Sequence, residues 1–293
     1  MKKIFFTVML SLITFYVSAQ KEINQYNPEL TFEKGILLFE NKHYASALEC
    51  FELYLSSADD KSDNKAVMAK YYEAASTLFL EESDGENKIT TFIKENPTAL
   101  VADQAKLLYA NHLFKTKKYR DALKTYKSIN TDNLSKDELD ECDFKQAYCY
   151  YQTQDITKAT PIFERLTKYT NDYNDDARYY YAHILYINGE LDESLEHFNI
   201  LQESSDYKDI ADIYILQINF NKGNHTIVIE NGDDVLQKAH KNRKSDIALM
   251  IAESWQHQGD YTKSLEYYNL ASQNSRRKLP REIEFNIGFC KMK

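Results

Sequence analysis

Apolar and small residues recur along this chain in a pattern that repeats about every 35 residues. In the clearest copy, apolar residues spaced three and four apart occupy 140–152, a polar turn follows at 153–155, and a second amphipathic run covers 156–166. The same arrangement follows again at 177–201. Spacings of three and four place residues on one face of an α-helix. The pattern therefore predicts pairs of short amphipathic helices joined by three-residue turns.

The large residue that follows each turn marks the register of the repeat. These marker residues are Tyr44, Tyr119, Ile156, Leu191, His225 and Tyr261. Their spacings are 75, 37, 35, 34 and 36 residues, and the first spacing corresponds to two periods with one unclear unit between them. A fixed period of this length is typical of a stacked helical array.

Small and aromatic residues keep step with the markers. Gly or Ala stands nine residues before the marker, and Ala or Ser stands three residues after it, with Leu216 and Val228 as exceptions. An aromatic residue stands seven after the marker, except at Gly232; the aromatic residues are Phe51, Tyr126, Phe163, Phe198 and Tyr268. Small residues let the two helices approach closely, and the larger ones need a neighbouring repeat to cover them.

Residues 28–293 are therefore expected to form one all-α array of about seven helical hairpins and a partial eighth. The low content of Gly and Pro, 7 and 4 among 293 residues, suits helices with short connections. Several units open on Asp or Ser, which predicts N-caps. These residues are Asp103, Asp140, Asp175, Asp209 and Ser245.

The last segment, Arg281–Lys293, has the pattern of a first helix without its partner. Gly288 occupies the small position, and the apolar residues include Phe285, Phe289 and Met292. Terminal repeats normally carry a polar outer face. We therefore expect either that the array continues beyond this helix or that a partner covers it.

The pattern resembles the tetratricopeptide repeat family over about residues 28–293. The small–turn–aromatic–small–aromatic order is strongest in the units that begin near residues 28, 103, 140, 175 and 245. The unit at 66–97 departs from the family because it has no proper turn, and the unit near 209 lacks its aromatic residue. The resemblance implies a right-handed superhelical solenoid of antiparallel helix pairs, whose first helices line a concave groove.

The resemblance also implies which first-helix positions face the groove. In this chain they are Asn111, Phe114, Phe144, Tyr148, Tyr151, Tyr179, His183, Tyr186, Ile213, Gln217 and Phe220. Tyr and Phe supply contact area with little rotamer entropy to lose, which suits binding of an extended peptide or a helix. The alternative is that these rings pack against each other. The family's basic clamp for a terminal carboxylate is matched by Asn111 alone, with no Lys beside it.

The first 19 residues predict a secretory signal peptide. Lys2 and Lys3 precede the mostly apolar run 4–17, and Val17-Ser18-Ala19 offers small or modest residues before a cut at Gln20. The apolar run is too short to span a bilayer, and an uncleaved anchor is the alternative. No Cys follows the cut, so the lipoprotein pattern is missing. Residues 20–27 read as a polar lead.

The net charge of the chain is −9, and removal of the two signal-peptide lysines makes it −11. An acidic chain argues against nucleic acids and anionic membranes as partners. The one basic cluster, Arg276–Lys278, reads as a solvated linker between units. No other apolar run is long enough to span a membrane.

The sequence contains none of the phosphate-loop, metalloprotease, nucleophile-elbow or paired-cysteine motifs. Glu253 and His257 could hold a general base, but a surface ion pair is the expected role. The cysteines Cys50, Cys142, Cys149 and Cys290 stand where the repeat requires small helical residues, so we expect buried free thiols. The acidic stretches 59–63 and 171–176 lack the ligand spacing of a calcium loop. We expect no enzyme activity, no cofactor and no metal.

These features predict a non-catalytic scaffold that binds a peptide or protein segment in the concave groove. Export predicts a location in the periplasm or cell envelope, and the resemblance extends to secreted repeat proteins of Gram-negative bacteria, some of which serve outer-membrane assembly. Two alternatives remain open. Tyrosines also stack on sugars, so the array could bind carbohydrate or peptidoglycan, or it could be the auxiliary N-terminal part of a larger protein.

Overall fold

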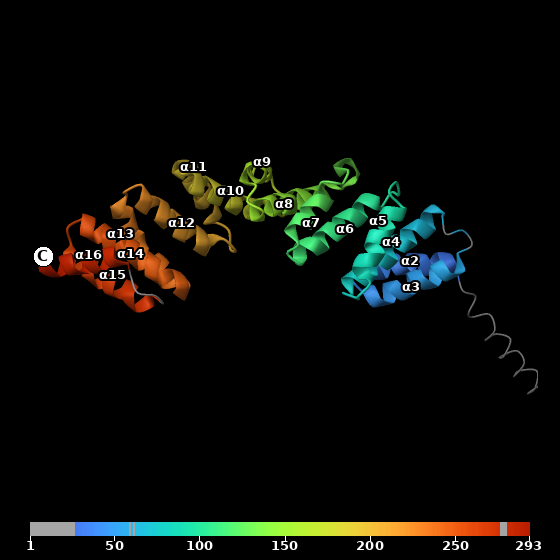
Figure 1. Cartoon of the computed structure of the whole chain (residues 1–293), viewed down its shortest axis with the longest axis horizontal. Helices are drawn as coiled ribbons and strands as arrows, with labels where there is room; N and C mark the ends of the chain where they lie inside the picture. The colour runs from blue at the N-terminus through green and yellow to red at the C-terminus, as the bar shows by residue number, and fades with distance from the viewer. Residues whose placement is uncertain (1–26, 59, 61, 276–279) are drawn as a thin grey trace, which may run out of the picture. The chain divides into compact units, whose positions relative to one another are not determined.

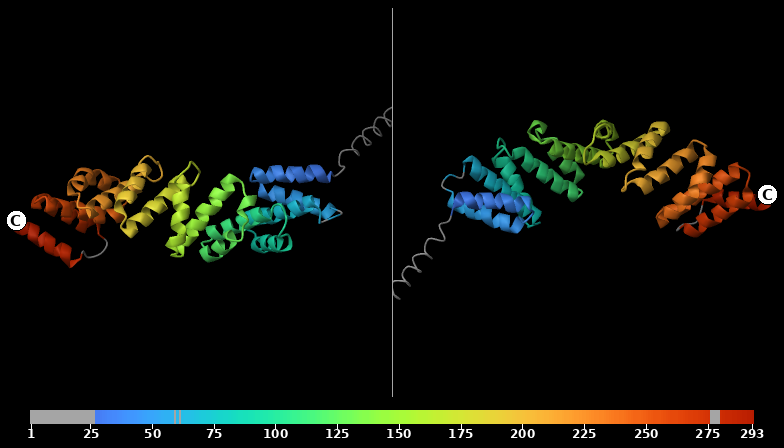
Figure 2. Two further views of the ribbon diagram at one scale, coloured as in Figure 1. Left: turned by 90° about the horizontal axis from the view of Figure 1, so that it is seen from above. Right: turned by 180° about the vertical axis from the view of Figure 1, so that it is seen from behind.

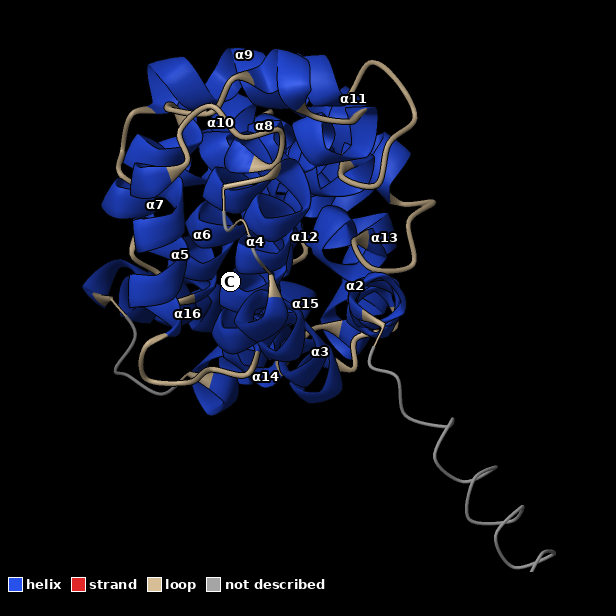
Figure 3. Ribbon diagram, turned by 90° about the vertical axis from the view of Figure 1, so that its right-hand side faces the viewer, coloured by secondary structure: helices blue, strands red, loops and turns tan. Residues whose placement is uncertain are grey.

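The computed structural model describes residues 27–58, 60, 62–275 and 280–293. In these residues the chain forms fifteen α-helices and one short 3₁₀ turn, with no β-strand (Figures 1 and 3). The all-α repeat fold is thereby confirmed. The expected signal peptide, nearly all of the polar lead and the basic cluster at 276–278 lie outside the described residues.

The contacts divide the chain into two compact units, with the boundary after Leu134. Within each unit every helix contacts the next one along the chain, as the succession of colours in Figure 2 also shows. Unit 1 contains α2 (Pro28–Glu40), α3 (Tyr44–Ser57), α4 (Asn64–Phe79), α5 (Gly85–Glu95), α6 (Ala102–Lys115), α7 (Tyr119–Tyr126) and the 3₁₀ turn Thr131–Asn133. Unit 2 contains α8 (Lys136–Gln152), α9 (Ile156–Leu166), α10 (Asn174–Asn188), α11 (Leu191–Leu201), α12 (Lys208–Asn221), α13 (His225–Lys238), α14 (Lys241–His257), α15 (Tyr261–Asn274) and α16 (Arg281–Met292).

One residue in the left-handed region follows the first helix of every pair. Its φ lies between 57° and 85°, and the residues are Lys42, Glu81, Lys117, Gln154, Gly189, Gly223 and Gly259. In six pairs the second helix begins two residues later, at the marker position. This conformation reverses the chain within a short turn. Only three of the seven are Gly, so the other four turns bear the steric cost of a β-carbon.

The unit at 66–97 also has this turn, so the expectation that it lacks a proper turn is wrong. Its left-handed residue is Glu81, and α5 begins four residues later instead of two. Ala74, seven residues before Glu81, is buried as the small residue of the unit. Gly85 approaches α4 so closely that a β-carbon would lie 2.9 Å from Leu78 Cα. The two additional loop residues hide the register in the sequence.

The small and aromatic positions pack against each other as the pattern predicts. A β-carbon on Gly35 would lie 2.8 Å from the Phe51 ring, which shows how closely α2 and α3 approach. Phe163 and Phe198, the corresponding rings of two later pairs, are fully buried. Burial of one such ring contributes about 1.5–3 kcal/mol to stability.

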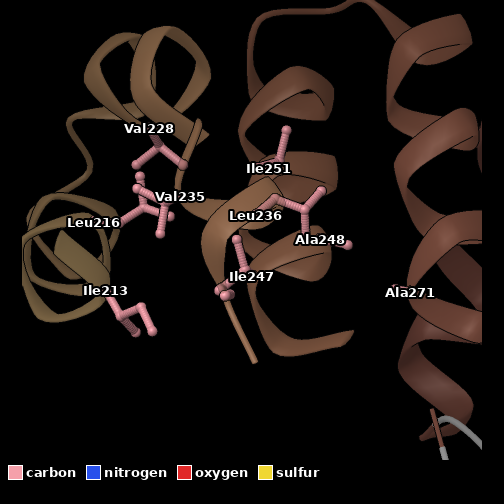
Figure 4. Packing of buried hydrophobic residues seen from close by; sticks show 10 residues of the cluster. Ile213, Leu216, Val228, Val235, Leu236, Ile247, Ala248, Ile251 and Ala271 are labelled. Carbon is pink, nitrogen blue, oxygen red and sulfur yellow. The ribbon is translucent and has the colours of Figure 1, made fainter. Parts of the chain in front are cut away.

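The unit with irregular small and aromatic positions compensates within its own core. Figure 4 shows Leu216 and Val228 facing Val235 in the cluster that α12, α13 and α14 form. Gly232 lies where other pairs have an aromatic ring, and its missing β-carbon would lie 2.6 Å from Ile251 Cγ1. The isoleucine of the next repeat thus occupies the space of the missing ring.

The expected N-caps are wrong, because the helices begin earlier. Asp103, Asp140, Asp175, Asp209 and Ser245 all lie within helices. The cap of α8 is Ser135, which forms a reciprocal capping box with Glu138. One of these residues, Asp140, instead binds a loop between helix pairs. Asp140 accepts a hydrogen bond from the hydroxyl of Tyr169 in the α9–α10 loop.

Helix α16 packs as a first helix on the preceding pair. Ile283 and Cys290 are buried in a cluster with Tyr268. Phe285 and Met292 are 70% and 78% exposed, as expected for a helix whose second face is not covered. In the described part of the chain, no helix is both long enough and apolar enough to cross a membrane.

Candidate functional site

The candidate site is the first-helix face, defined by three positions in each repeat. They stand three residues before the small residue, one after it and four after it. In unit 2 these positions are Phe144, Tyr148 and Tyr151 on α8; Tyr179, His183 and Tyr186 on α10; Ile213, Gln217 and Phe220 on α12; Leu249, Glu253 and Gln256 on α14; and Phe285, Phe289 and Met292 on α16. The α14 and α16 residues were not among those inferred from the sequence.

In unit 1, the two expected groove residues contact their own hairpin. Asn111 accepts a hydrogen bond from the Tyr126 hydroxyl at 2.7 Å, which ties α6 to α7. Phe114 packs edge-on against Tyr119, with ring centroids 5.9 Å apart. The Asn111 amide oxygen therefore accepts a hydrogen bond within the fold. Asn111 is the one residue that matches the family's carboxylate clamp, and this oxygen is not free for a ligand.

The α8 residues form the first part of an aromatic layer in unit 2. Phe144 is buried and stacks on Tyr173, with ring centroids 4.9 Å apart. Tyr148 and Tyr151 are partly exposed, and both contact the Tyr180 ring at centroid distances of 5.2 Å. Phe144 is therefore a core residue, whereas the two tyrosines present part of their rings at the surface.

The layer continues from α10 to α12 without a break. The Tyr151 hydroxyl lies 3.0 Å from His183 Nδ1, which joins α8 to α10. Tyr179 stacks on Tyr207 at 5.3 Å, and Tyr186 packs edge-on against Tyr214 at 5.5 Å. The rings therefore pack across adjacent helices, and several of them stay partly exposed.

The polar side of the layer lies further along α12. Gln217 is half-buried and has no hydrogen-bond partner among the described residues. Asn221 donates a hydrogen bond to the Tyr186 hydroxyl at 3.1 Å. Ile213 is buried in the core cluster of α12–α14, and Phe220 packs against the same cluster. Of the α12 positions, Gln217 thus offers a free amide at the surface.

Tyr180, Tyr173 and Tyr207 complete the layer, although sequence reasoning missed them. Tyr180 contacts five other rings, those of Phe144, Tyr148, Tyr151, Phe163 and Tyr179. It stands beside the groove position Tyr179 and outside the three-position register, so the sequence pattern does not single it out. Tyr173 and Tyr207 come from the loops before α10 and α12, where a helical periodicity gives no signal.

Burial shifts the pKa of several groups of the layer in the direction that favours the neutral form. Burial raises the pKa of Tyr173 to about 12. Burial likewise raises the pKa of Tyr180 and Tyr214 and lowers the pKa of His183. Neutral hydroxyls and a neutral imidazole donate and accept hydrogen bonds, so the layer offers polar contacts together with ring surface.

Charges at the edge of the layer are acidic. Six residues before the small residue stand Glu141 on α8, Asp176 on α10, Asp246 on α14 and Glu282 on α16. Glu141 pairs with Lys145 at 2.6 Å, and Asp176 accepts a hydrogen bond from Tyr207. No Lys or Arg occupies a groove position in unit 2.

The candidate acid–base pair does not form. Among the described residues, neither a hydrogen bond nor an ion pair within 4 Å joins Glu253 to His257, so the expected surface ion pair is wrong. The reason is that His257 stacks flat on His225, with ring centroids 4.1 Å apart. The described residues contain no group of three His, Cys, Asp or Glu side chains that could hold a metal ion.

The four cysteines are free and buried, as predicted. Burial raises the pKa of both Cys142 and Cys149 to about 12, so neither is a thiolate at neutral pH. Nucleophilic and metal-ligand roles require the thiolate. These two side chains therefore act as small core residues.

Comparison with protein families identifies the repeat. A family model described as tetratricopeptide repeat matches residues 144–208, which include the α8–α9 and α10–α11 pairs except for the start of α8. The two helix pairs in this range are tetratricopeptide repeats. Proteins of this family are in general non-catalytic scaffolds for protein–protein interaction, and no curated protein matches the chain.

Solved structures of bacterial tetratricopeptide repeat proteins share the fold. The C-terminal part of one from Cytophaga hutchinsonii is 14% identical with a TM-score of 0.62, and the match covers 87% of this chain and 99% of that one. One from Parabacteroides merdae is 14% identical with a TM-score of 0.50, covering 90% and 98%. YrrB, described as having an unusual peptide-binding site, is 14% identical with a TM-score of 0.52, covering 70% and 98%.

Proposed function

We propose that this protein is a non-catalytic scaffold that binds an extended segment of a partner protein along the first-helix face of unit 2. The observation that carries the proposal is the continuous, partly exposed layer of Tyr148, Tyr151, Tyr179 and Tyr186. Rings held in place by their neighbours lose little entropy when a partner covers them. Tyrosine is also among the residues that contribute most to protein interfaces.

The polar groups of the same face support an extended segment in particular. A peptide strand exposes backbone N–H and C=O groups that must keep hydrogen-bond partners when they are buried. The free amide of Gln217, on the same face as the rings, can supply such partners, and so can the Tyr186 hydroxyl, which accepts from Asn221 and keeps its own proton to donate. YrrB, which shares the fold, is described as binding a peptide at an unusual site.

We also propose that the chain acts in the bacterial cell envelope, on the basis of the signal-peptide pattern in residues 1–19. An outer-membrane-associated complex is the corresponding setting for its partner. The sugar-binding alternative is disfavoured by the geometry of the layer. Most rings meet edge-on or tilted, as Tyr148 and Tyr180 do at 86°, so they form no coplanar platform.

The test is affinity capture with matched variants at two glutamines. Gln217→Arg places a long charged side chain on the first-helix face, and Gln237→Arg makes the same change at an exposed position of α13. Protein retained from envelope extract by the full chain and by Gln237→Arg, but lost from Gln217→Arg, supports the proposal. Circular dichroism checks that both variants fold. Equal retention by the two variants moves binding to another face.

A further inference from the structure

The first-helix face ends in a cleft between α14 and α16. The cleft has a volume of about 400 Å³ and opens to solvent. Glu253 stands one residue after the small residue of α14, and Phe289 stands one residue after that of α16. In the repeat register these are the positions of Tyr148 and His183. The cleft is therefore the continuation of the proposed binding face, with a carboxylate at the position that Tyr148, His183 and Gln217 occupy in the earlier repeats of unit 2.

Glu253 is a partly buried charged residue of this cleft whose carboxylate lacks a partner among the described residues. It is half-buried, and no hydrogen bond or ion pair joins it to any described residue. Burial and the neighbouring Glu282 raise its pKa, while His257 opposes this rise. A half-buried carboxylate without a partner reduces the stability of the fold.

The two amide side chains at the cleft have partners. The Tyr268 hydroxyl donates a hydrogen bond to Gln256 Oε1 at 2.7 Å, and Asn286 hydrogen-bonds the same hydroxyl. The carboxylates of Glu253 and Glu282 have no hydrogen bond or ion pair with a described residue. His257, which stacks on His225, also lines the cleft. The cleft residues include no Lys or Arg.

Two aromatic rings line the cleft together with these carboxylates, and Lys293 Nζ lies 5.6 Å from the centroid of one of them, Phe289. Tyr261 and Phe289 pack edge-on with centroids 5.6 Å apart, and both line the cleft. An ammonium or guanidinium group is attracted to an aromatic face, and its methylene stem packs on apolar surface. The carboxylates and rings together match a long cationic side chain. A metal ion is a poorer match, because the described residues contain no group of three ligands for one.

We propose that this cleft receives a lysine or arginine side chain of the bound partner segment, with Glu253 as its counter-ion. This inference rests on the function proposed above, and it adds the chemistry of the partner. The segment lies along the tyrosine layer and places a basic residue at the α14–α16 end. The acidic edge of the face, which carries no Lys or Arg at the groove positions, favours such a segment over an acidic one.

The test uses a phage-displayed library of random 12-residue peptides selected on the full chain. Glu253→Gln removes the charge and keeps the shape, and Glu266→Gln removes the same charge from an exposed site on α15. We expect the selected peptides to be enriched in Lys or Arg at one position. Their affinity should fall about tenfold or more for Glu253→Gln and stay unchanged for Glu266→Gln.

Replacement of that basic residue by norleucine in the peptide should cause the same loss for the native chain and little further loss for Glu253→Gln. Selected peptides that lack a common basic residue, but whose binding Gln217→Arg abolishes, overturn the cleft proposal and leave the proposed function standing. Equal affinities for Glu253→Gln and Glu266→Gln also overturn it. Absence of any selected peptide overturns both proposals. Because the Glu253 carboxylate has no partner, Glu253→Gln should fold at least as stably as the native chain, which thermal unfolding checks.

Discussion

Replacement of Phe198 by Ala tests whether the interlocking of small and aromatic residues holds the repeats together. The Phe198 ring is fully buried between repeats and stacks on Tyr214 at a centroid distance of 4.6 Å and an angle of 6°. Removal of a fully buried ring costs about 3–5 kcal/mol, because the lost transfer free energy is joined by that of a cavity. A matched control is Phe285→Ala, since that ring is 70% exposed. A surface change of this kind costs less than about 0.5 kcal/mol.

Native-state hydrogen exchange is the suitable assay, because a repeat array opens locally and a single unfolding midpoint averages over its parts. A loss of 3 kcal/mol corresponds to a protection factor reduced by more than about a hundredfold. We expect this reduction in α10, α11 and α12, where the cluster around Phe198 lies, and little change in α2 and α3. Equal effects of Phe198→Ala and Phe285→Ala would refute the packing account. So would a loss spread evenly over the whole chain.

Three further predictions concern single groups. Cys142 and Cys149 should resist a thiol reagent at pH 8 in the native chain and react rapidly in denaturant, because burial raises the pKa of both thiols to about 12; labelling followed by mass spectrometry measures this. Tyr169→Phe should destabilise unit 2 by about 1–3 kcal/mol in denaturant titrations, since it leaves the buried carboxylate of Asp140 without this donor. Burial and Asp140 raise the pKa of Tyr169 to about 12, whereas an unfolded tyrosine titrates near 10. The native chain should therefore lose this stability as the pH rises from about 10 to 12, and Tyr169→Phe should show a smaller loss there. Gln154→Gly should stabilise the α8–α9 pair by about 0.5–1 kcal/mol, because Gln154 has a φ of 68° that Gly adopts without strain.

The sequence predicts the packing of the repeats where the residue type itself indicates the packing. Gly35 can be recognised because a close approach of two helices requires a small residue. Phe51 can be recognised because the core between repeats requires a large apolar one. Leu216, Val228 and Gly232 looked like a defect of the repeat. The structure shows that Ile251 of the next repeat fills the space beside Gly232. This compensation involves two repeats, so the residue type at one position does not indicate it.

Backbone conformation and loop contacts were harder to predict. Glu81 reverses the chain in the left-handed region, but its side chain gives no sign of that conformation, so the sequence predicts an irregular unit where the structure has the second hairpin of unit 1. The sequence predicts Asp140 as a helix cap because Asp favours that position. It lies within α8 and accepts a hydrogen bond from Tyr169 of a distant loop. A contact of this kind depends on the path of the loop relative to the helix, which the local sequence does not indicate.

The sequence register assigns Tyr148, Tyr151 and Tyr186 to one helix face, and in the structure they lie in one continuous layer of rings. It could not separate a buried ring such as Phe144 from a partly exposed one, because both obey the same spacing. From the sequence, Glu253 is a candidate partner for His257, whereas the structure shows it without that partner in a cleft.

Photo-crosslinking tests the central claim, that the first-helix face of unit 2 is the binding site, most directly. A benzoylphenylalanine residue replaces Gln217 in one full-length chain and Gln237 in another, and each is irradiated in envelope extract. We predict a discrete adduct with a partner protein from position 217 and none from position 237. An adduct from position 237 alone, or equal adducts from both, would contradict the account.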